Sequence, residues 1–300
     1  MAVRSPAISV VLTNFDRLSY LKQSVASVRA QTFRDWELIV VDGGSSDGSR
    51  EWLRKQRGLQ AALLSGNPGP AALMNEGVGR ARGRLVAFLE SDDYWLARHL
   101  EAMVGAFDDR RAQIVHCGCR FVGESGRLLN VLDGTGRMLR QENAVDPVFT
   151  SLTGSPTPVL LSLAMMRKSL FSAVGPFDES FRWLASDMDF YYKTAQRWGQ
   201  DAFRFVDEVL AVRRRHPGQL SRLLLQVPRG RWPRRRAWTA RQKQSLLDMV
   251  CFYRRHERVV ARVLAKSARP LRKGRKQGGP VRPRKRAQGP QARLERRDRL

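Results

Sequence analysis

Three carboxylates, from Glu90, Asp92 and Asp93, lie within four positions of the sequence, directly after an apolar run at residues 85–89. Carboxylate oxygens at the end of a strand can hold a hard divalent cation such as Mg2+ or Mn2+. A cation there would neutralise the charge of a diphosphate, so that a nucleoside diphosphate could leave. Asp92 could equally be the N-cap of a helix that starts near Leu96. The spacing alone gives the metal site and the helix cap equal weight.

Two further acidic positions could take part in chemistry. Asp42 follows the apolar segment 36–41 and precedes two glycines, where its carboxylate could accept hydrogen bonds from a base or a ribose. Taken alone, an ordinary glycine-rich turn with a helix-capping Asp47 is the better interpretation. Asp187 stands where another helix is predicted to begin. Inverting group transfer needs a base within reach of the acceptor hydroxyl, although an Asp at a helix start is more often a cap.

Strands and helices alternate along the first 110 residues. The apolar pattern predicts strands at residues 8–12, 36–41, 62–64 and 85–89, and helices around residues 18–28, 51–53, 71–81 and 96–107. This alternation favours βαβ units and a parallel sheet, in which ligands bind beyond the carboxyl ends of the strands. Three strand ends carry polar clusters, at residues 13–16, 42–44 and 90–93. The sequence therefore predicts one site where these clusters meet.

The rest of the chain is less regular. The pattern predicts a loop with edge strands at 123–158, strands at 159–163 and 203–206, helices at 167–174 and 187–198, and a basic amphipathic helical stretch at 237–265. From residue 266 onward apolar residues are too sparse to build a core, so this tail is expected to be disordered.

The net charge is +26, and it is unevenly spread. Residues 266–300 carry 14 Lys and Arg against 2 acidic residues, and further basic clusters stand at 213–215 and 234–236. This distribution predicts a polyanionic partner outside the active site.

The chain has three cysteines, Cys117, Cys119 and Cys251, with no pairing framework, which fits a reducing compartment. His116, Cys117 and Cys119 could suggest a zinc site, but no second ligand cluster follows, so we expect structural thiols on a buried strand. No apolar run is long enough to span a bilayer, and the N-terminus does not read as a signal peptide. We therefore expect a cytoplasmic protein.

Eight segments follow one another along the chain: residues 8–17 (ISVVLTNFDR), 27–33 (SVRAQTF), 37–48 (ELIVVDGGSSDG), 75–77 (NEG), 81–83 (ARG), 89–95 (LESDDYW), 174–179 (VGPFDE) and 186–190 (SDMDF). In this order they resemble the motifs of family 2 glycosyltransferases. The resemblance covers roughly residues 7–220. One such motif would be a weak signal, whereas the ordered series is highly specific.

The resemblance implies the GT-A fold, an α/β class with a Rossmann-like, mostly parallel central sheet flanked by helices, here followed by a C-terminal helical extension and the basic tail. It implies a GT-A domain at 1–225, with a nucleotide-binding half at about 1–110 and an acceptor-binding half at about 111–225. The helical extension would occupy 226–265 and the disordered tail 266–300.

The resemblance also implies roles for individual residues. Asp187 falls on the family's catalytic base, while Asp93, Asp92 and Glu90 fall on its metal-binding acidic motif. The nucleotide-sugar site is expected to comprise Thr13, Asn14, Asp16, Asp42, Asn75, Asp92 and His216. The implied cofactor is Mg2+ or Mn2+, and the implied donor is a UDP-, GDP- or dTDP-sugar.

The chain departs from the family pattern at four points. Residues 13–16 replace the usual Pro-Thr-Tyr-Asn, and Glu90 replaces the first Asp of Asp-Ser-Asp-Asp with a longer arm. Met74 stands where the family has an Arg, so one cation near the phosphates is missing. Ser186 replaces the Glu of the Glu-Asp pair, which alters the acceptor side but keeps the presumed base.

The function expected from this resemblance is an inverting, metal-dependent hexosyltransferase acting on a glycan or lipid-linked acceptor in cell-surface polysaccharide or glycolipid synthesis. A nucleotidyltransferase is the rival enzyme, but residues 13–17 contain no glycine to cradle a triphosphate. A nucleic-acid-binding protein is the rival from another class, because the chain is strongly basic. We favour attachment of the basic C-terminus to an anionic membrane, at its inner face, over nucleic-acid binding.

Overall fold

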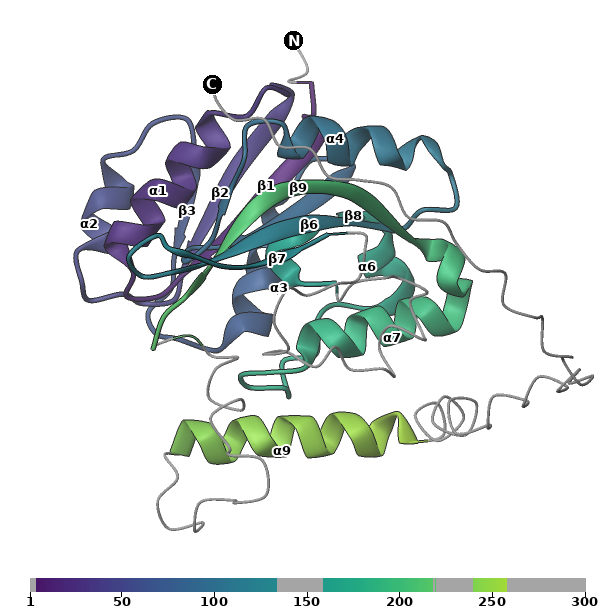
Figure 1. Ribbon diagram of the computed structural model, residues 1–300. Helices are drawn as coiled ribbons and strands as arrows, with labels where there is room; N and C mark the ends of the chain where they lie inside the picture. Colours follow the sequence, from purple (N-terminus) through teal and green to yellow (C-terminus); the bar gives the residue numbers. More distant parts are fainter. Residues whose placement is uncertain (1–3, 134–158, 218, 220–239, 258–300) are drawn as a thin grey trace, which may run out of the picture.

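The computed structural model describes residues 4–133, 159–217, 219 and 240–257 of the 300-residue chain. A single curled sheet runs through these residues, with helices on both faces (Figure 1). Its strand order is β3-β2-β1-β4-β8-β6-β9-β5, and β7 pairs with β6. The expected fold class, α/β with a mostly parallel sheet flanked by helices, is confirmed.

The first half of the sheet is a regular βαβ series. Its elements are β1 (Ile8–Asn14), α1 (Leu18–Arg29), β2 (Trp36–Asp42), α2 (Ser49–Arg54), β3 (Gln60–Leu63), α3 (Pro70–Arg80) and β4 (Leu85–Glu90). The strands β3, β2, β1 and β4 are all parallel neighbours. Their carboxyl ends therefore meet at one edge of the sheet, which is where the sequence predicted a site.

The first half ends with β5 (Tyr94–Trp95) and α4 (His99–Gly105), whose buried side chains join a core with those of β1 and β2. The second half is mixed. Its elements are η1 (Ala106–Asp108), β6 (Ile114–Gly123), β7 (Leu128–Leu132), η2 (Leu161–Leu163), β8 (Ala164–Arg167), α6 (Ser169–Val174), α7 (Ser186–Trp198), η3 (Gln200–Ala202), β9 (Phe203–Arg215) and α9 (Ala240–Arg255). β8 is antiparallel to both β4 and β6, whereas β9 is parallel to β6.

Three expected elements differ from the structure. The helix expected from residue 96 begins at His99, because the Leu96 N–H donates to Leu210 O and so joins the strand layer. The strand expected at 159–163 is a 3-10 turn that ends where β8 starts. The last strand, expected to stop at Val206, continues to Arg215 because β6 offers it a parallel partner along its whole length.

Alternating strand residues build two cores, one on each face of the sheet. Val11, Ile39 and Phe88 pack beneath α3, α6 and α7, while Val10 and Leu38 pack beneath α1, α2 and α4. Because both faces are covered, the strands of the first half read as continuous apolar runs rather than as alternating ones. Gly77 allows α3 to lie directly on β1, since a Cβ there would collide with Val11.

The helix α9 lies against α7 on the outer side of the same face (Figure 1). Its Phe252 is fully buried in the core beside Tyr192. The domain boundaries expected at 225 and 265 fall outside the described residues. Within the described part of the chain, no helix combines the length and apolar character needed to cross a membrane.

Candidate active site

Three adjoining hollows open at the carboxyl ends of β1 and β4, and Arg17 lines all three. The β1 hollow lies beside Thr13 and Asn14, at the end of the first strand. The α7 hollow lies between the acidic turn after β4 and the start of α7. The rim hollow lies next to Asp16 and His216. The site is therefore a continuous cleft across the edge that the strand ends form.

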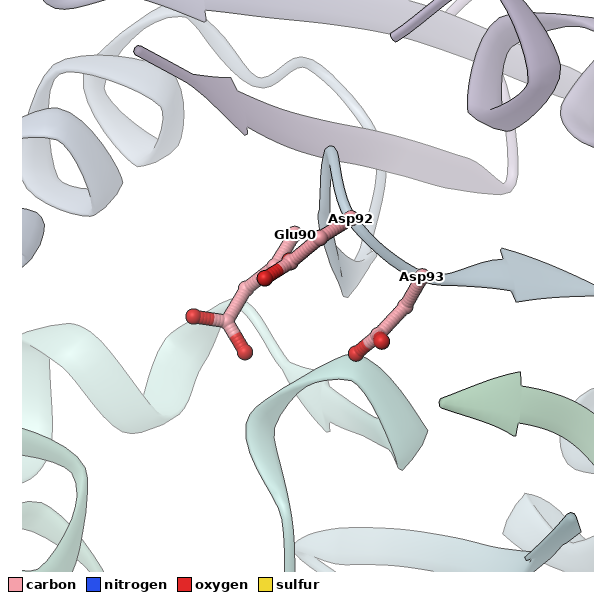
Figure 2. A group of neighbouring side chains, drawn as sticks. All are labelled: Glu90, Asp92 and Asp93. Atoms are coloured by element: carbon pink, nitrogen blue, oxygen red, sulfur yellow. The ribbon is translucent and has the colours of Figure 1, made fainter. Parts of the chain in front are cut away.

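The acidic turn after β4 brings Glu90, Asp92 and Asp93 together. One ligand oxygen from each carboxylate can be chosen so that all three lie within 4.8 Å of one another. Figure 2 shows the three side chains converging from a single turn. Ser24 holds the turn from α1, because its hydroxyl donates to the backbone oxygen of Ser91 at 2.8 Å. The expected acidic cluster is thus assembled by the fold.

The three carboxylates have different surroundings. Asp93 is fully buried, and its two oxygens accept bonds from Arg213 Nε at 3.0 Å and from the Arg214 backbone N–H at 3.1 Å. Glu90 and Asp92 instead line the α7 hollow. The cleft therefore meets Glu90 and Asp92, while Asp93 lies behind them and binds the strand β9.

Four basic groups surround this cluster. Asp92 Oδ2 lies 2.9 Å from His216 Nε2 and 3.2 Å from a guanidinium nitrogen of Arg17. Arg213 reaches Glu90 Oε2 at 3.4 Å as well as Asp93. Arg214 donates to the backbone oxygen of Asp92 at 2.6 Å. The acidic turn thus lies among three arginines and one histidine.

The arginines correct one interpretation drawn from the sequence. The basic cluster at 213–215 was expected to serve a polyanion outside the active site. In the structure it is the end of β9, where Arg213 and Arg214 turn into the site and Arg215 lies over Phe121. Arg17 and Arg213 are candidate site residues that sequence reasoning missed. The signal for Arg213 was its place three residues before His216.

Burial and charge set the acidity of the cluster. Burial and the neighbouring Asp92 raise the pKa of Glu90 to about 7, against the opposing charge of Arg213. Burial also raises the pKa of Asp93. Burial alone would raise the pKa of Asp92 too, but the hydrogen bond with His216 and the charges of Arg17 and Arg213 lower it overall. Asp92 is therefore the most readily ionised of the three carboxylates.

The residues present fit a divalent cation. Asp92 Oδ1 is buried and has no hydrogen-bond partner, although its carboxylate is the one held in the charged form. A charged carboxylate oxygen without a hydrogen-bond partner is suited to bind a cation. Glu90 offers a second oxygen beside it in the same hollow. Oxygen donors of this kind suit Mg2+ or Mn2+.

Asp187 lies across the α7 hollow from the acidic turn, in the first turn of α7. Its Oδ1 accepts the backbone N–H of Met188, and burial raises its pKa. Asp189 faces the protein interior, where it pairs with Lys193 at 2.6 Å and with His256 at 2.8 Å. The helix therefore presents Asp187, and not Asp189, to the cleft.

The remaining expected site residues divide into two groups. Thr13 and Asn14 line the β1 hollow, and Asp16 and His216 line the rim hollow. Asp42 and Asn75 line none of the three hollows.

Asp42 is fully buried, and its carboxylate accepts bonds from Asn14 at 2.7 Å and from the Ser45 backbone and hydroxyl. Asn75 bonds the backbone of Phe177 through both its oxygen and its nitrogen. In this structure these two side chains hold the walls of the cleft and do not enter it. Their expected contact with the donor stays a prediction.

The cysteines at 117 and 119 lie on the buried strand β6, as expected. Cys117 and Cys119 are fully buried, and burial raises the pKa of the Cys117 thiol well above its usual value. Among the described residues, the acidic turn is the cluster with metal-ligand spacing, and the thiols do not belong to it.

Comparison with known proteins supports this architecture. The family model described as Glycosyl transferase family 2 matches residues 9–174. A glycosyltransferase of Rickettsia prowazekii, itself uncharacterized, is 24% identical over 74% of this chain and 68% of its own. The enzyme WfgD of Escherichia coli, a UDP-Glc:alpha-D-GlcNAc-diphosphoundecaprenol beta-1,3-glucosyltransferase, is 33% identical over 32% of this chain and 39% of its own length.

A solved structure shares the fold. It is the mannosyltransferase PcManGT from Pyrobaculum calidifontis in complex with GDP-Man and Mn2+, with a TM-score of 0.55 and 17% identity. The match covers 88% of this chain and 76% of that one.

Proposed function

The chain belongs to glycosyl transferase family 2, since the family model spans more than half of it, and we propose that it is an inverting hexosyltransferase that uses a nucleoside-diphosphate sugar. One observation carries this proposal: Glu90, Asp92, Arg213 and Asp187 line the same hollow. The acidic turn and Arg213 could together bind a diphosphate and its cation. Asp187, in the same hollow, could accept the proton of an acceptor hydroxyl. Membership of the family supports a glycosyltransferase over the nucleotidyltransferase alternative.

The donor diphosphate is proposed to bind between Arg17, Arg213 and the acidic turn. Asp92 and Glu90 would hold Mg2+ or Mn2+, and that cation would neutralise charge on the leaving diphosphate. The Mn2+ in the PcManGT complex supports this choice. Asp93 acts one step removed, because its oxygens orient Arg213 and the end of β9. His216 orients Asp92 through their hydrogen bond.

The nucleotide is proposed to occupy the β1 hollow, beside Thr13 and Asn14. Asn14 Oδ1 is buried without a hydrogen-bond partner and would accept a bond from the donor. Asp42 contributes by holding Asn14 in place. Asp16 would close the rim of the same site from a left-handed backbone conformation, with φ of 52°.

Asp187 is proposed to be the general base of a single displacement. It takes the proton of the acceptor hydroxyl as the hydroxyl oxygen attacks the anomeric carbon, and the bond to the diphosphate breaks on the opposite side. This geometry inverts the anomeric centre. The raised pKa of Asp187 brings its basicity closer to neutral pH, where general bases are most effective.

The acceptor is proposed to be a glycan or a lipid-linked sugar of cell-surface polysaccharide synthesis. The lipid-linked acceptor in the name of WfgD supports this class. The basic C-terminal segments would hold the enzyme at an anionic membrane face, because each Lys or Arg near such a surface contributes about 1 kcal/mol. The net charge of +26 supports the same location at the inner face.

The decisive experiment screens UDP-, GDP- and dTDP-sugars for binding by calorimetry and for hydrolysis, with and without Mn2+. We expect one nucleotide class to bind, with an affinity that Mn2+ raises about tenfold or more, because Asp92 and Glu90 offer oxygen ligands. In Asp92→Asn the gain from Mn2+ should vanish. The matched control is Asp109→Asn, an acid at a distance from the cleft that pairs with Arg111. If no nucleotide sugar binds, the proposed function is wrong.

A further inference from the structure

One wall of the α7 hollow is a short loop that leads into α7. Trp183, Leu184, Ala185 and Ser186 all line this hollow, opposite the acidic turn. Trp183 lines the β1 hollow as well. The loop therefore borders both the proposed donor position and the space where an acceptor would meet Asp187.

This loop is held in a backbone conformation that its residues do not favour. Ala185 has a φ of 70°, in the left-handed region, although its side chain carries a Cβ. Such a conformation is strained for a residue with a Cβ, so it persists only where the surroundings impose it. The position is two residues before Asp187, so whatever imposes it also orients the start of α7.

The restraint comes from Asp248 of α9, which lies 65 residues after Trp183 in the chain. Asp248 is buried, and its Oδ2 accepts the backbone N–H of Trp183 at 2.7 Å and that of Leu184 at 3.1 Å. Its Oδ1 accepts from Gln244 Nε2 at 3.0 Å. Bonds from backbone N–H groups to a charged carboxylate are among the stronger hydrogen bonds in proteins. One side chain thus fixes two consecutive peptides of the wall.

α9 is itself anchored, so Asp248 cannot drift with its helix. Phe252 is fully buried against Tyr192 of α7, with ring centroids 4.9 Å apart. His256 and Arg255 both reach Asp189, at 2.8 and 3.2 Å. These contacts attach α9 to the side of α7 that carries Asp189 and Tyr192, whereas Asp187 faces the α7 hollow.

We propose that Asp248 is a positioning residue for sugar transfer: through the Trp183 and Leu184 amides it sets the acceptor wall and the placement of Asp187. The inference rests on the proposed function. Asp248 lines none of the three hollows, so it acts on the site only through this loop. The side chains proposed to bind the donor diphosphate are those of Arg17, Arg213 and the acidic turn, whereas the hydrogen bonds of Asp248 go to the loop and to Gln244.

The test uses the full chain with Asp248→Ala and the milder Asp248→Asn. Acceptor transfer should fall about tenfold to a hundredfold in kcat/KM for the acceptor, because small displacements of a catalytic group reduce rates on that scale. The Kd for UDP with Mn2+ should stay within about twofold of wild type. Gln244→Ala is the matched control, since it removes the partner of Oδ1 and leaves both loop bonds; its transfer rate should stay close to that of wild type.

Amide hydrogen exchange supplies a readout that needs no turnover. In the wild type the Trp183 and Leu184 amides should exchange slowly, and in both Asp248 variants they should exchange faster while the amides of β1 do not change. Slow exchange in the variants, or unchanged transfer in a folded variant, overturns the proposal. A parallel loss of UDP binding also overturns it, because that pattern marks general destabilisation. If the wild type transfers no sugar but the exchange pattern holds, the proposed function fails and the positioning of the loop stands.

Discussion

The two halves of the sheet supply opposite charges to the same cleft. The first half, up to the end of α4, contributes the carboxylates of Glu90, Asp92 and Asp93. The second half contributes Arg213 and Arg214 from β9, and His216 directly after it. Neither half alone supplies both the acidic and the basic side chains of the site. The comparison shows that the acidic motif is a local feature of sequence, while its counter-charges depend on how a distant strand pairs.

Asp187 is the exception to this division, because it is an acid from the second half. Replacing it tests whether the second half contributes chemistry as well as charge. Asp187→Asn keeps the shape and removes the basicity, so kcat should fall by about 10²–10⁴-fold while the Kd for UDP stays unchanged. Steady-state transfer assays and calorimetry measure the two quantities.

Asp189→Asn is the control for this prediction. Asp189 is 1% exposed and faces Lys193 and His256, so its replacement should lower the free energy of unfolding. If Asp189→Asn loses kcat without loss of stability and Asp187→Asn turns over normally, the base has been assigned to the wrong residue.

The contact between the halves can be broken at Arg213. Its side chain is 12% exposed and pairs with Asp93, whose side chain is 1% exposed. Arg213→Gln leaves the buried acids without their main counter-charge, so the free energy of unfolding should fall by about 3 kcal/mol. Urea denaturation measures the loss.

The double variant Arg213→Gln with Asp93→Asn completes a double-mutant cycle. It should be more stable than the sum of the two single losses implies, because no unpaired charge is left at Asp93. Strict additivity would mean that the two halves are not coupled through this pair.

Each half also buries a histidine, and acid should weaken both halves alike. Burial lowers the pKa of His99 and of His116 from 6.5 to about 3. Between pH 6.5 and about pH 3 these histidines are protonated in the unfolded chain but not in the folded chain. The free energy of unfolding therefore falls as the pH falls through this window. Between pH 7 and pH 5 each histidine should cost about 2 kcal/mol.

His99→Phe keeps a ring that can stack on Trp95, which lies 4.2 Å from His99 between ring centroids. This variant should lose about 2 kcal/mol less than wild type between pH 7 and pH 5. His116→Phe should do the same for the second half. Chemical denaturation at the two pH values measures both, and two separate transitions would show that the halves unfold independently.

The smallest effect on stability is expected from the basic tail, which lies outside the described residues. Truncation after Lys266 should leave the melting temperature nearly unchanged, because residues 266–300 have too few apolar side chains to form a core. The truncated chain should bind anionic vesicles less tightly, and the difference should shrink as salt is raised. Equal vesicle binding by both chains would contradict attachment through the tail.

The same contrast explains what could be predicted from sequence. Apolar runs and glycine turns predicted the strands and helices of the first half and the acidic turn at Glu90–Asp93, because each depends on neighbouring residues. The full extent of β9 could not be predicted, since the strand at 207–215 depends on pairing with β6 and β5, which are distant in the sequence. The position of Arg213 in the site, the burial of Asp42 and the hydrogen bonds from Asp248 to the loop at Trp183 could not be predicted either, because each depends on contacts between distant segments.

The late position of β9 has a consequence for protein synthesis. Asp93 leaves the ribosome 120 residues before Arg213, its partner. At ordinary rates of elongation this interval lasts on the order of ten seconds. During it the nascent first half carries its carboxylates without their arginines, and β6 has no β9 to cover its edge. The cleft is therefore completed only near the end of translation, and a chain stalled before β9 exposes a strand edge that invites chaperones or aggregation.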